Sequence, residues 1–134
     1  MSKARILVVD DTPATVDLAA FVLNAAAFAV RSATDAGSAI LQVHLFKPDL
    51  ILMDVQMPGL DGLELTRQLK ADPSTRHIVV VAFTAFAMRG DEAKMLAAGC
   101  DGYIAKPFDI TSFAQTVHAY LHPRGVSEAQ CSPA

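Results

Sequence analysis

Short apolar runs alternate with longer helical patterns along this 134-residue chain, and this alternation constrains the fold more than any other feature. The runs predict five strands, Arg5–Val9, Phe28–Ala33, Leu50–Met53, Ile78–Phe83 and Gly102–Ala105. Three runs (ILVV, LILM and IVVVAF) are apolar at successive positions, as in strands buried on both faces of a parallel sheet. Right-handed crossovers between these strands predict an α/β fold, a doubly wound five-stranded parallel sheet with five helices covering both faces.

Capping residues mark several of the predicted helix ends. Thr12 can cap the first helix, with Pro13 at its first position, where a missing N–H costs nothing. Gly99 is expected in the left-handed conformation that often follows a helix, and Asp109 can cap the last helix. Ala27 is the exception, because it follows the first helix at a place where a positive φ would favour glycine.

The length fits one domain with a single core, which we expect over residues 1–122, followed by a polar, aperiodic and flexible tail over 123–134. The net charge is −3 and no basic cluster is present, which argues against direct nucleic-acid binding. The longest near-apolar stretch, 18–30, is shorter than the ~20 residues needed to span a bilayer. Without a signal-peptide pattern either, the sequence predicts a cytoplasmic protein with no membrane partner.

Acidic residues follow two of the predicted strands at their carboxyl ends. Asp10 and Asp11 follow the first strand, and Asp54 follows the third. Because the carboxyl ends of parallel strands meet at one edge of the sheet, we expect the three carboxylates in one crevice. A hard divalent cation would relieve their mutual repulsion, and Mg²⁺ (or Mn²⁺) prefers such oxygen ligands. The sequence therefore predicts a metal site where Asp54 can act as a nucleophile toward phosphorus.

A hydroxyl and an ammonium group complete the predicted crevice, because Thr84 lies at the end of the fourth strand and Lys106 at the end of the fifth. Phosphoryl transfer mainly requires positioning and neutralisation of the equatorial oxygens. The metal can neutralise one oxygen, the Lys106 ammonium a second, and the Thr84 hydroxyl with a backbone N–H the third. Each of these residues alone is typical of a turn, a cap or a buried strand, so the prediction depends on their joint occurrence.

Four motifs at these strand ends resemble those of the receiver family of response regulators from two-component systems. They are Val-Val-Asp-Asp (8–11), Leu-Met-Asp-Val-Gln-Met-Pro-Gly-Leu-Asp-Gly (52–62), Thr-Ala (84–85) and Tyr-Ile-Ala-Lys-Pro-Phe (103–108). Their order and spacing match the family, and the resemblance covers about residues 4–122. It implies a flavodoxin-like strand order 2-1-3-4-5. It also implies a phosphoacceptor switch rather than an enzyme, with self-phosphorylation from phosphodonors and autodephosphorylation.

The resemblance assigns roles to the acidic residues. Asp54 would be the phosphoacceptor. Asp11, Asp54 and the backbone carbonyl of Gln56 would bind Mg²⁺, and Asp10 would act through water.

Further roles concern the fourth and fifth strands. A cis bond between Lys106 and Pro107 would direct the lysine into the site. Tyr103 would be an aromatic switch that turns inward as Thr84 moves toward the phosphoryl group; its alternative is a half-buried strand aromatic with a solvated hydroxyl. Phe86 occupies a position that influences attack by water, which predicts a long-lived phosphoryl state, unless it only shields the fourth helix.

By this resemblance the chain is similar to single-domain response regulators of the cell-cycle type. A histidine kinase or histidine phosphotransferase would phosphorylate it, and the face formed by the fourth helix, fifth strand and fifth helix would bind a downstream protein. One alternative is a receiver module from a hybrid histidine kinase or larger regulator. A phosphatase with an Asp nucleophile is less favoured, because haloacid-dehalogenase-like enzymes place a second Asp where this chain has Gln56. A flavin-binding module lacks its phosphate loop, since Asp10 and Asp11 would repel phosphate.

Overall fold

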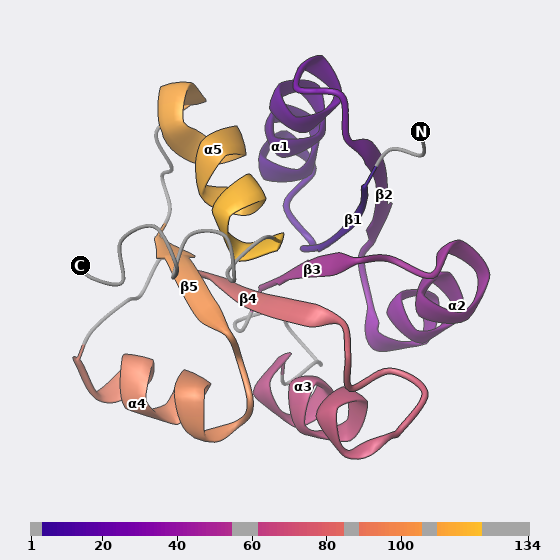
Figure 1. Cartoon of the computed structure of the whole chain (residues 1–134), viewed down its shortest axis with the longest axis vertical. Coiled ribbons are helices and arrows are strands. Elements are labelled where there is room, and N and C mark those ends of the chain that lie inside the picture. The colour runs from indigo at the N-terminus through magenta and orange to yellow at the C-terminus, as the bar shows by residue number, and fades with distance from the viewer. Residues whose placement is uncertain (1–3, 55–61, 85–88, 106–109, 122–134) are drawn as a thin grey trace.

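The computed structural model describes residues 4–54, 62–84, 89–105 and 110–121, and five strands alternate with five helices within them (Figure 1). The elements are β1 (Arg5–Val9), α1 (Pro13–Ala25), β2 (Ala29–Ala33), α2 (Ala36–Phe46), β3 (Leu50–Met53), α3 (Gly62–Ala71), β4 (Val79–Thr84), α4 (Arg89–Ala97), β5 (Gly102–Ala105) and α5 (Ile110–Leu121). All strand pairs are parallel, and the order in the sheet is β2-β1-β3-β4-β5. The predicted fold class and strand order are therefore confirmed.

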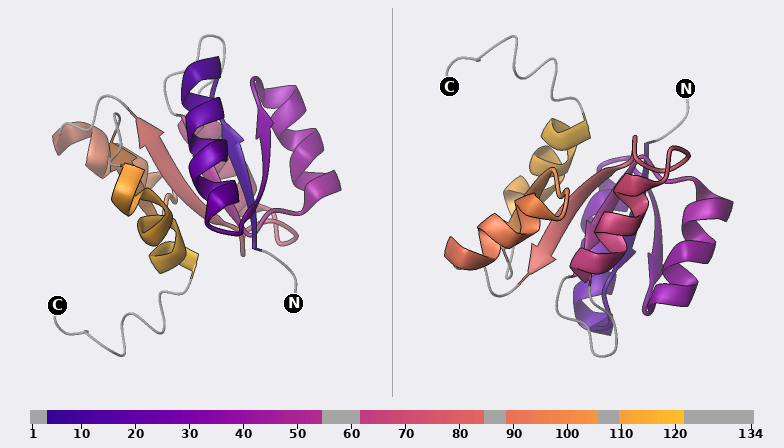
Figure 2. Two further views of the ribbon diagram at one scale, coloured as in Figure 1. Left: turned by 90° about the horizontal axis from the view of Figure 1, so that it is seen from above. Right: turned by 90° about the horizontal axis from the view of Figure 1, so that it is seen from below.

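The helices cover both faces of the sheet (Figure 2). Helices α1 and α5 pack on one face, and α2, α3 and α4 pack on the other. Alternate residues of the strands enter the two layers, so that Leu7 and Ile51 belong to one hydrophobic cluster and Val8 and Leu52 to the other. Both faces of the central strands are thus buried, which explains why their sequences are continuous apolar runs rather than alternating ones.

Three strand boundaries, one in β2 and two in β4, differ from the predicted ones by one residue. Strand β2 begins at Ala29, because the N–H of Phe28 donates to the carbonyl of Leu23 and the residue belongs to the turn after α1. Strand β4 begins at Val79 and extends to Thr84, where it still pairs with β5. The apolar character of Phe28 reflects its burial in the core and not membership of a strand.

Positive φ angles occur at Ala27 (72°), Lys47 (53°) and Gly99 (106°). Gly99 has the predicted left-handed backbone, and Ala27 has the positive φ at which glycine would be favoured. Lys47, at the C-terminal cap of α2, was missed because lysine gives no sign of this conformation. Thr12 occupies the N-cap position of α1, with Pro13 after it, but its side chain makes no capping hydrogen bond. The cap predicted at Asp109 lies outside the described residues, as do His122, the last residue of the predicted domain, and the predicted tail.

Candidate functional site

The sheet continues one residue beyond β1 and β3, and this extension positions two acidic residues. The N–H of Asp10 donates to the carbonyl of Ala33 at 3.0 Å, and the N–H of Asp54 donates to the carbonyl of Val9 at 2.9 Å. Because β1 and β3 are adjacent in the sheet, Asp10 and Asp54 lie side by side at its carboxyl edge. Their backbone is held by the most deeply buried strands of the molecule, so the two carboxylates start from a rigid base.

Asp11 joins these two residues in an acidic cluster. One carboxylate oxygen each from Asp10, Asp11 and Asp54 lies within 4.8 Å of the others. Asp10 and Asp54 are buried, and Asp11 is exposed, so the cluster can be reached from solvent on the Asp11 side. Two unit charges at this separation repel by about 3 kcal/mol or more at an effective dielectric constant of 20. The structure thus brings together the three carboxylates that the sequence predicts would meet.

A turn at the start of α1 holds the Asp10 carboxylate. Its Oδ1 accepts a hydrogen bond from the N–H of Thr12 at 2.9 Å. The sequence predicts Thr12 only as a helix cap, and this contact of its N–H was not predicted. The pattern that could have revealed it is the aspartate two positions before an N-terminal helix residue, which favours an Asx turn. One oxygen of Asp10 is therefore oriented by the backbone before any ligand arrives.

The remaining predicted residues are described only in part. Thr84 is the last residue of β4 and pairs with Ala105 of β5; its side chain is not among the described ones. Tyr103 is half-buried on β5 and packs against the cluster that contains Met95 of α4. Four residues, Gln56, Phe86, Lys106 and Pro107, lie outside the described residues. The roles predicted for them, including the cis bond, stay predictions.

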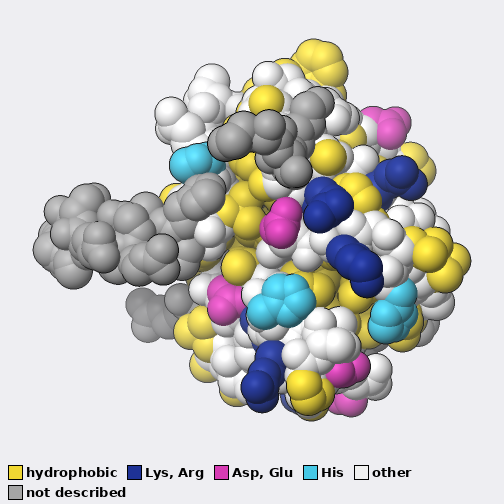
Figure 3. All heavy atoms as spheres, turned by 45° about the vertical axis from the view of Figure 1, so that its right-hand side comes forward, with side chains coloured by type: hydrophobic (Ala, Val, Ile, Leu, Met, Phe, Trp, Pro, Cys, Tyr) yellow, Lys and Arg dark blue, Asp and Glu magenta, His cyan; other side chains and the backbone are white. Residues whose placement is uncertain are grey.

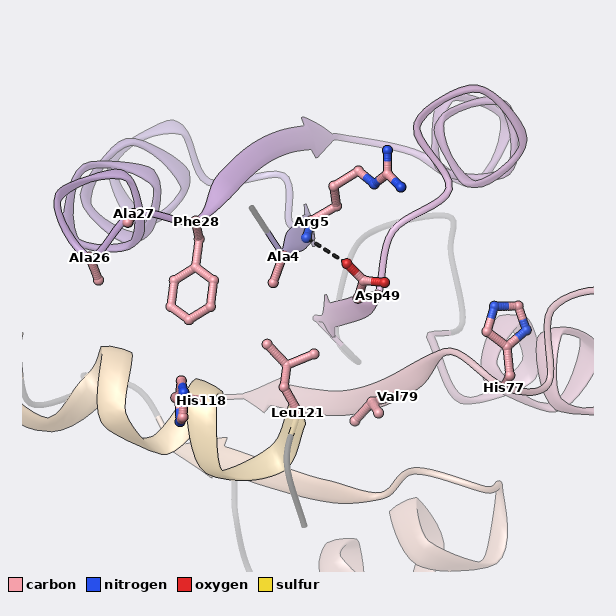
Figure 4. Close-up of a pocket in the computed structure, with 10 residues that line it drawn as sticks. All are labelled: Ala4, Arg5, Ala26, Ala27, Phe28, Asp49, His77, Val79, His118 and Leu121. Atoms are coloured by element: carbon pink, nitrogen blue, oxygen red, sulfur yellow. Dashed lines mark hydrogen bonds between the residues drawn. The ribbon is translucent and has the colours of Figure 1, made fainter. Parts of the chain in front are cut away.

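A cavity of about 680 Å³ lies at the opposite, amino edge of the sheet (Figure 4). Its walls include Phe28, Val79 and Leu121, and Asp49, His77 and other polar residues border them. The N–H of Arg5 donates to Asp49 Oδ2 at 2.8 Å. None of the acidic-cluster residues lines this cavity, so it is separate from the candidate site.

Comparison with known proteins agrees with this geometry. The family model of the response regulator receiver domain matches residues 6–118. The chain belongs to the response regulator receiver family. The polar-differentiation response regulator DivK of Brucella anthropi is 38% identical over 116 residues, which are 87% of this chain and 94% of that protein. DivK of Brucella ovis is also 38% identical, over 90% of this chain and 98% of its own length.

Two solved structures extend this similarity to three dimensions. A putative response regulator from Chloroflexus aurantiacus superposes with a TM-score of 0.84 at 28% identity, over 90% of this chain and 98% of the other. The receiver domain of the sensor histidine kinase PA1611 from Pseudomonas aeruginosa has a TM-score of 0.80 at 30% identity, with the same coverage. That structure has a magnesium ion coordinated in its active-site cleft. This chain is thus a receiver domain homologous to single-domain response regulators, and a phosphoacceptor role in signalling fits it.

Among the residues that the structure describes, no helix is long and apolar enough to cross a membrane.

Proposed function

We propose that this receiver domain is a switch in which Asp54 accepts a phosphoryl group. The observation that supports the proposal is the acidic cluster, in which a buried Asp54 at the end of β3 meets oxygens of Asp10 and Asp11 within 4.8 Å. A carboxylate fixed by the central sheet, in a cluster that is exposed at Asp11, can attack a phosphorus atom that approaches from the Asp11 side.

The donor set fits Mg²⁺ (or Mn²⁺), because it consists of hard carboxylate oxygens that are close enough to share one small cation. Asp11, Asp54 and the backbone carbonyl of Gln56 would bind the ion, and Asp10, held by the Thr12 N–H, would act through water. When bound, the ion neutralises charge on the cluster and on a phosphoryl oxygen. The magnesium in the receiver domain of the Pseudomonas kinase supports this assignment.

In the transfer step an Asp54 carboxylate oxygen attacks the phosphorus of a phosphohistidine. A new P–O bond forms as the P–N bond breaks, and the imidazole leaves with the electron pair and takes up a proton. With acetyl phosphate, a P–O bond breaks instead and acetate leaves. Lys106 and Thr84 would bind the remaining phosphoryl oxygens. Attack by water on the acyl phosphate would return Asp54 to its free state, and Phe86 would slow that step.

The phosphoryl group would come from a histidine kinase or histidine phosphotransferase. As Thr84 and Tyr103 respond, the face formed by α4, β5 and α5 would change its affinity for a downstream protein. We place the protein in the cytoplasm, with a receiver domain over 1–122 and a flexible tail over 123–134, and without nucleic-acid or membrane binding. A role as a single-domain regulator follows the similarity to DivK. The alternative, a receiver module from a hybrid histidine kinase or larger regulator, is not better supported than the single-domain role.

Intact-mass measurement after incubation with Mg²⁺ and acetyl phosphate tests the proposal. The wild type should gain the mass of one phosphoryl group, and chelation of the metal by EDTA should prevent the gain. Asp54→Asn should gain nothing, whereas Asp17→Asn, which changes an exposed carboxylate on α1, should behave like the wild type. A phosphoryl group that persists in Asp54→Asn would refute the assignment. Catalytic release of phosphate from unactivated monoesters would instead support a phosphatase.

A further inference from the structure

Helix α2 lacks charged residues on its solvent side. Its 11 residues, Ala36–Phe46, include no Asp, Glu, Lys or Arg. Val43 is buried in the core, whereas Ile40, Leu41 and Leu45 are 39%, 55% and 70% exposed. A surface helix ordinarily presents charged and polar residues to solvent. Helix α2 instead carries apolar side chains on both its buried and its exposed sides.

Ile40, Leu41 and Leu45 form what we call the α2 face. Leu41 and Leu45 are one helical turn apart and are therefore neighbours on the helix surface, with Ile40 adjacent in sequence. Single exposed leucines are ordinary on proteins. Contiguous apolar patches with a polar border instead mark sites of interaction, because covering them removes apolar surface from water.

A groove of about 230 Å³ borders the α2 face and is lined by Arg5, Arg31, Gln42, Leu45 and Phe46. The Arg31 guanidinium lies over the Phe46 ring, 5.4 Å from its centroid. The Arg5 side chain points away from the cavity at the amino edge (Figure 4). On the side of the molecule that carries α2, Lys and Arg side chains lie beside hydrophobic ones (Figure 3).

Neither arginine of the groove is paired with a carboxylate in the described part of the chain. The ion pairs between described residues are Arg67–Glu64 and Lys70–Asp101. The groove itself has no acidic lining residue. The chain as a whole carries a net charge of −3, so this local basic character runs against its average. Guanidinium groups bind carboxylates through two parallel hydrogen bonds, and stacking on an aromatic ring fixes their orientation.

We propose that the α2 face and its groove bind an amphipathic helix of a partner protein, one with an apolar stripe flanked by Asp or Glu. Leucine-type side chains of the partner would cover Leu41 and Leu45, as in helix-in-groove recognition, and its carboxylates would pair with Arg5 and Arg31. The apolar part of the site excludes a nucleic-acid backbone as the better ligand, because phosphates would gain nothing from Leu45 and Phe46. This surface lies on α2, apart from the face of α4, β5 and α5, so one molecule can hold two partners.

Fluorescence anisotropy with the full chain and a labelled peptide tests the proposal. The probe is a helical peptide of about five turns with leucines on one side and glutamates beside them. Leu45→Asp and Arg31→Glu should each weaken its binding at least about tenfold. Phe21→Asp is the matched control, because Phe21 is 72% exposed on α1, outside both proposed binding faces, and it should bind like the wild type. A second peptide with lysines in place of the glutamates should bind Arg31→Glu better than it binds the wild type.

Equal binding of both peptides to the wild type, or unchanged binding by Leu45→Asp, would overturn the proposal. Self-association of the protein alone, seen in sedimentation velocity and lost in Leu45→Asp, would make a second copy the occupant and also overturn it. Binding to phosphatidylglycerol vesicles that is lost in Arg31→Glu would do the same in favour of a membrane. Leu41→Asp is a second variant should Leu45→Asp fail to fold. All variants should keep acetyl phosphate labelling at Asp54, which separates this proposal from the proposed function.

Discussion

Aspartates at the two edges of the sheet have opposite surroundings. At the carboxyl edge, Asp10, Asp11 and Asp54 bring three carboxylates together within 4.8 Å. At the amino edge, Asp101 Oδ2 accepts hydrogen bonds from Lys70 Nζ at 2.9 Å and from a backbone N–H at 2.8 Å. Repulsion among the carboxylates of the first group destabilises the folded state, whereas the hydrogen bonds of Asp101 stabilise it. The same residue type therefore opposes folding at one edge of the sheet and stabilises the fold at the other.

The contact at the amino edge joins three elements. Lys70, in the last turn of α3, also donates to the carbonyl of Ile78 at 2.7 Å. The carboxylate of Asp101 accepts a hydrogen bond from the N–H of Val80 in β4, and the N–H of Asp101 donates to the carbonyl of Val80. A Cβ on Gly99 would lie 2.9 Å from Cγ of Lys70, so the turn after α4 rests on the lysine stem. The α4–β5 turn is thereby fixed to α3 and to the start of β4.

The largest effect is expected from Asp101→Ala. The variant leaves the Val80 N–H and the Lys70 ammonium without their acceptor, and the free energy of unfolding should fall by about 2 kcal/mol. Equilibrium urea unfolding measures it. Asp101→Asn keeps one oxygen acceptor and should lose less, so equal losses in the two variants would mean that the charge, and not the hydrogen bond to Val80, carries the stability.

Asp54→Asn should change the free energy of unfolding in the opposite direction to Asp101→Ala. In metal-free buffer it removes one charge from the cluster, and the free energy of unfolding should rise by about 1 kcal/mol or more, because like charges at this distance repel. The same urea experiment measures it, with Asp17→Asn as a control that should change little. A loss of stability in Asp54→Asn would show that the carboxylates of the cluster do not oppose folding, and the contrast between the edges would fail.

Mg²⁺ should stabilise the wild type and leave Asp54→Asn nearly unchanged. A cation that binds only the folded chain adds about 1.4 kcal/mol at ten times its dissociation constant. Thermal unfolding as a function of Mg²⁺ concentration measures this gain. Asp101→Asn is the matched control at the other edge, and it should gain as much as the wild type. An equal gain in Asp54→Asn would place the cation elsewhere on the protein.

Topology explains why one edge could be predicted from the sequence and the other could not. Each strand was recognised within one residue, and parallel strands must end at a common edge, so Asp10 and Asp54 had to meet. No comparable rule pairs Lys70 with Asp101, which are 31 positions apart. Lys70 lies in α3 and Asp101 in the turn before β5, and whether they meet depends on how these segments pack together. The same holds for Lys47, whose left-handed backbone at the end of α2 follows from where the chain must turn and not from the residue itself.

Asp35 provides the smallest test, since it is an exposed aspartate outside both regions. Its Oδ1 accepts a hydrogen bond from the N–H of Ser38 at 2.7 Å at the start of α2, and this bond holds the pKa of the Asp35 carboxyl below its ordinary value. A carboxyl with a lowered pKa stabilises the fold above its unfolded pKa, and this contribution disappears as the pH falls through the folded value. Asp35→Asn keeps an oxygen for the cap but cannot titrate. In urea unfolding, the free energy of unfolding of the wild type should therefore be slightly higher than that of the variant at neutral pH. This difference should vanish below the pKa that Asp35 has in the folded protein. A difference that persists in strong acid would mean that the shape of the cap matters and that the charge of Asp35 does not.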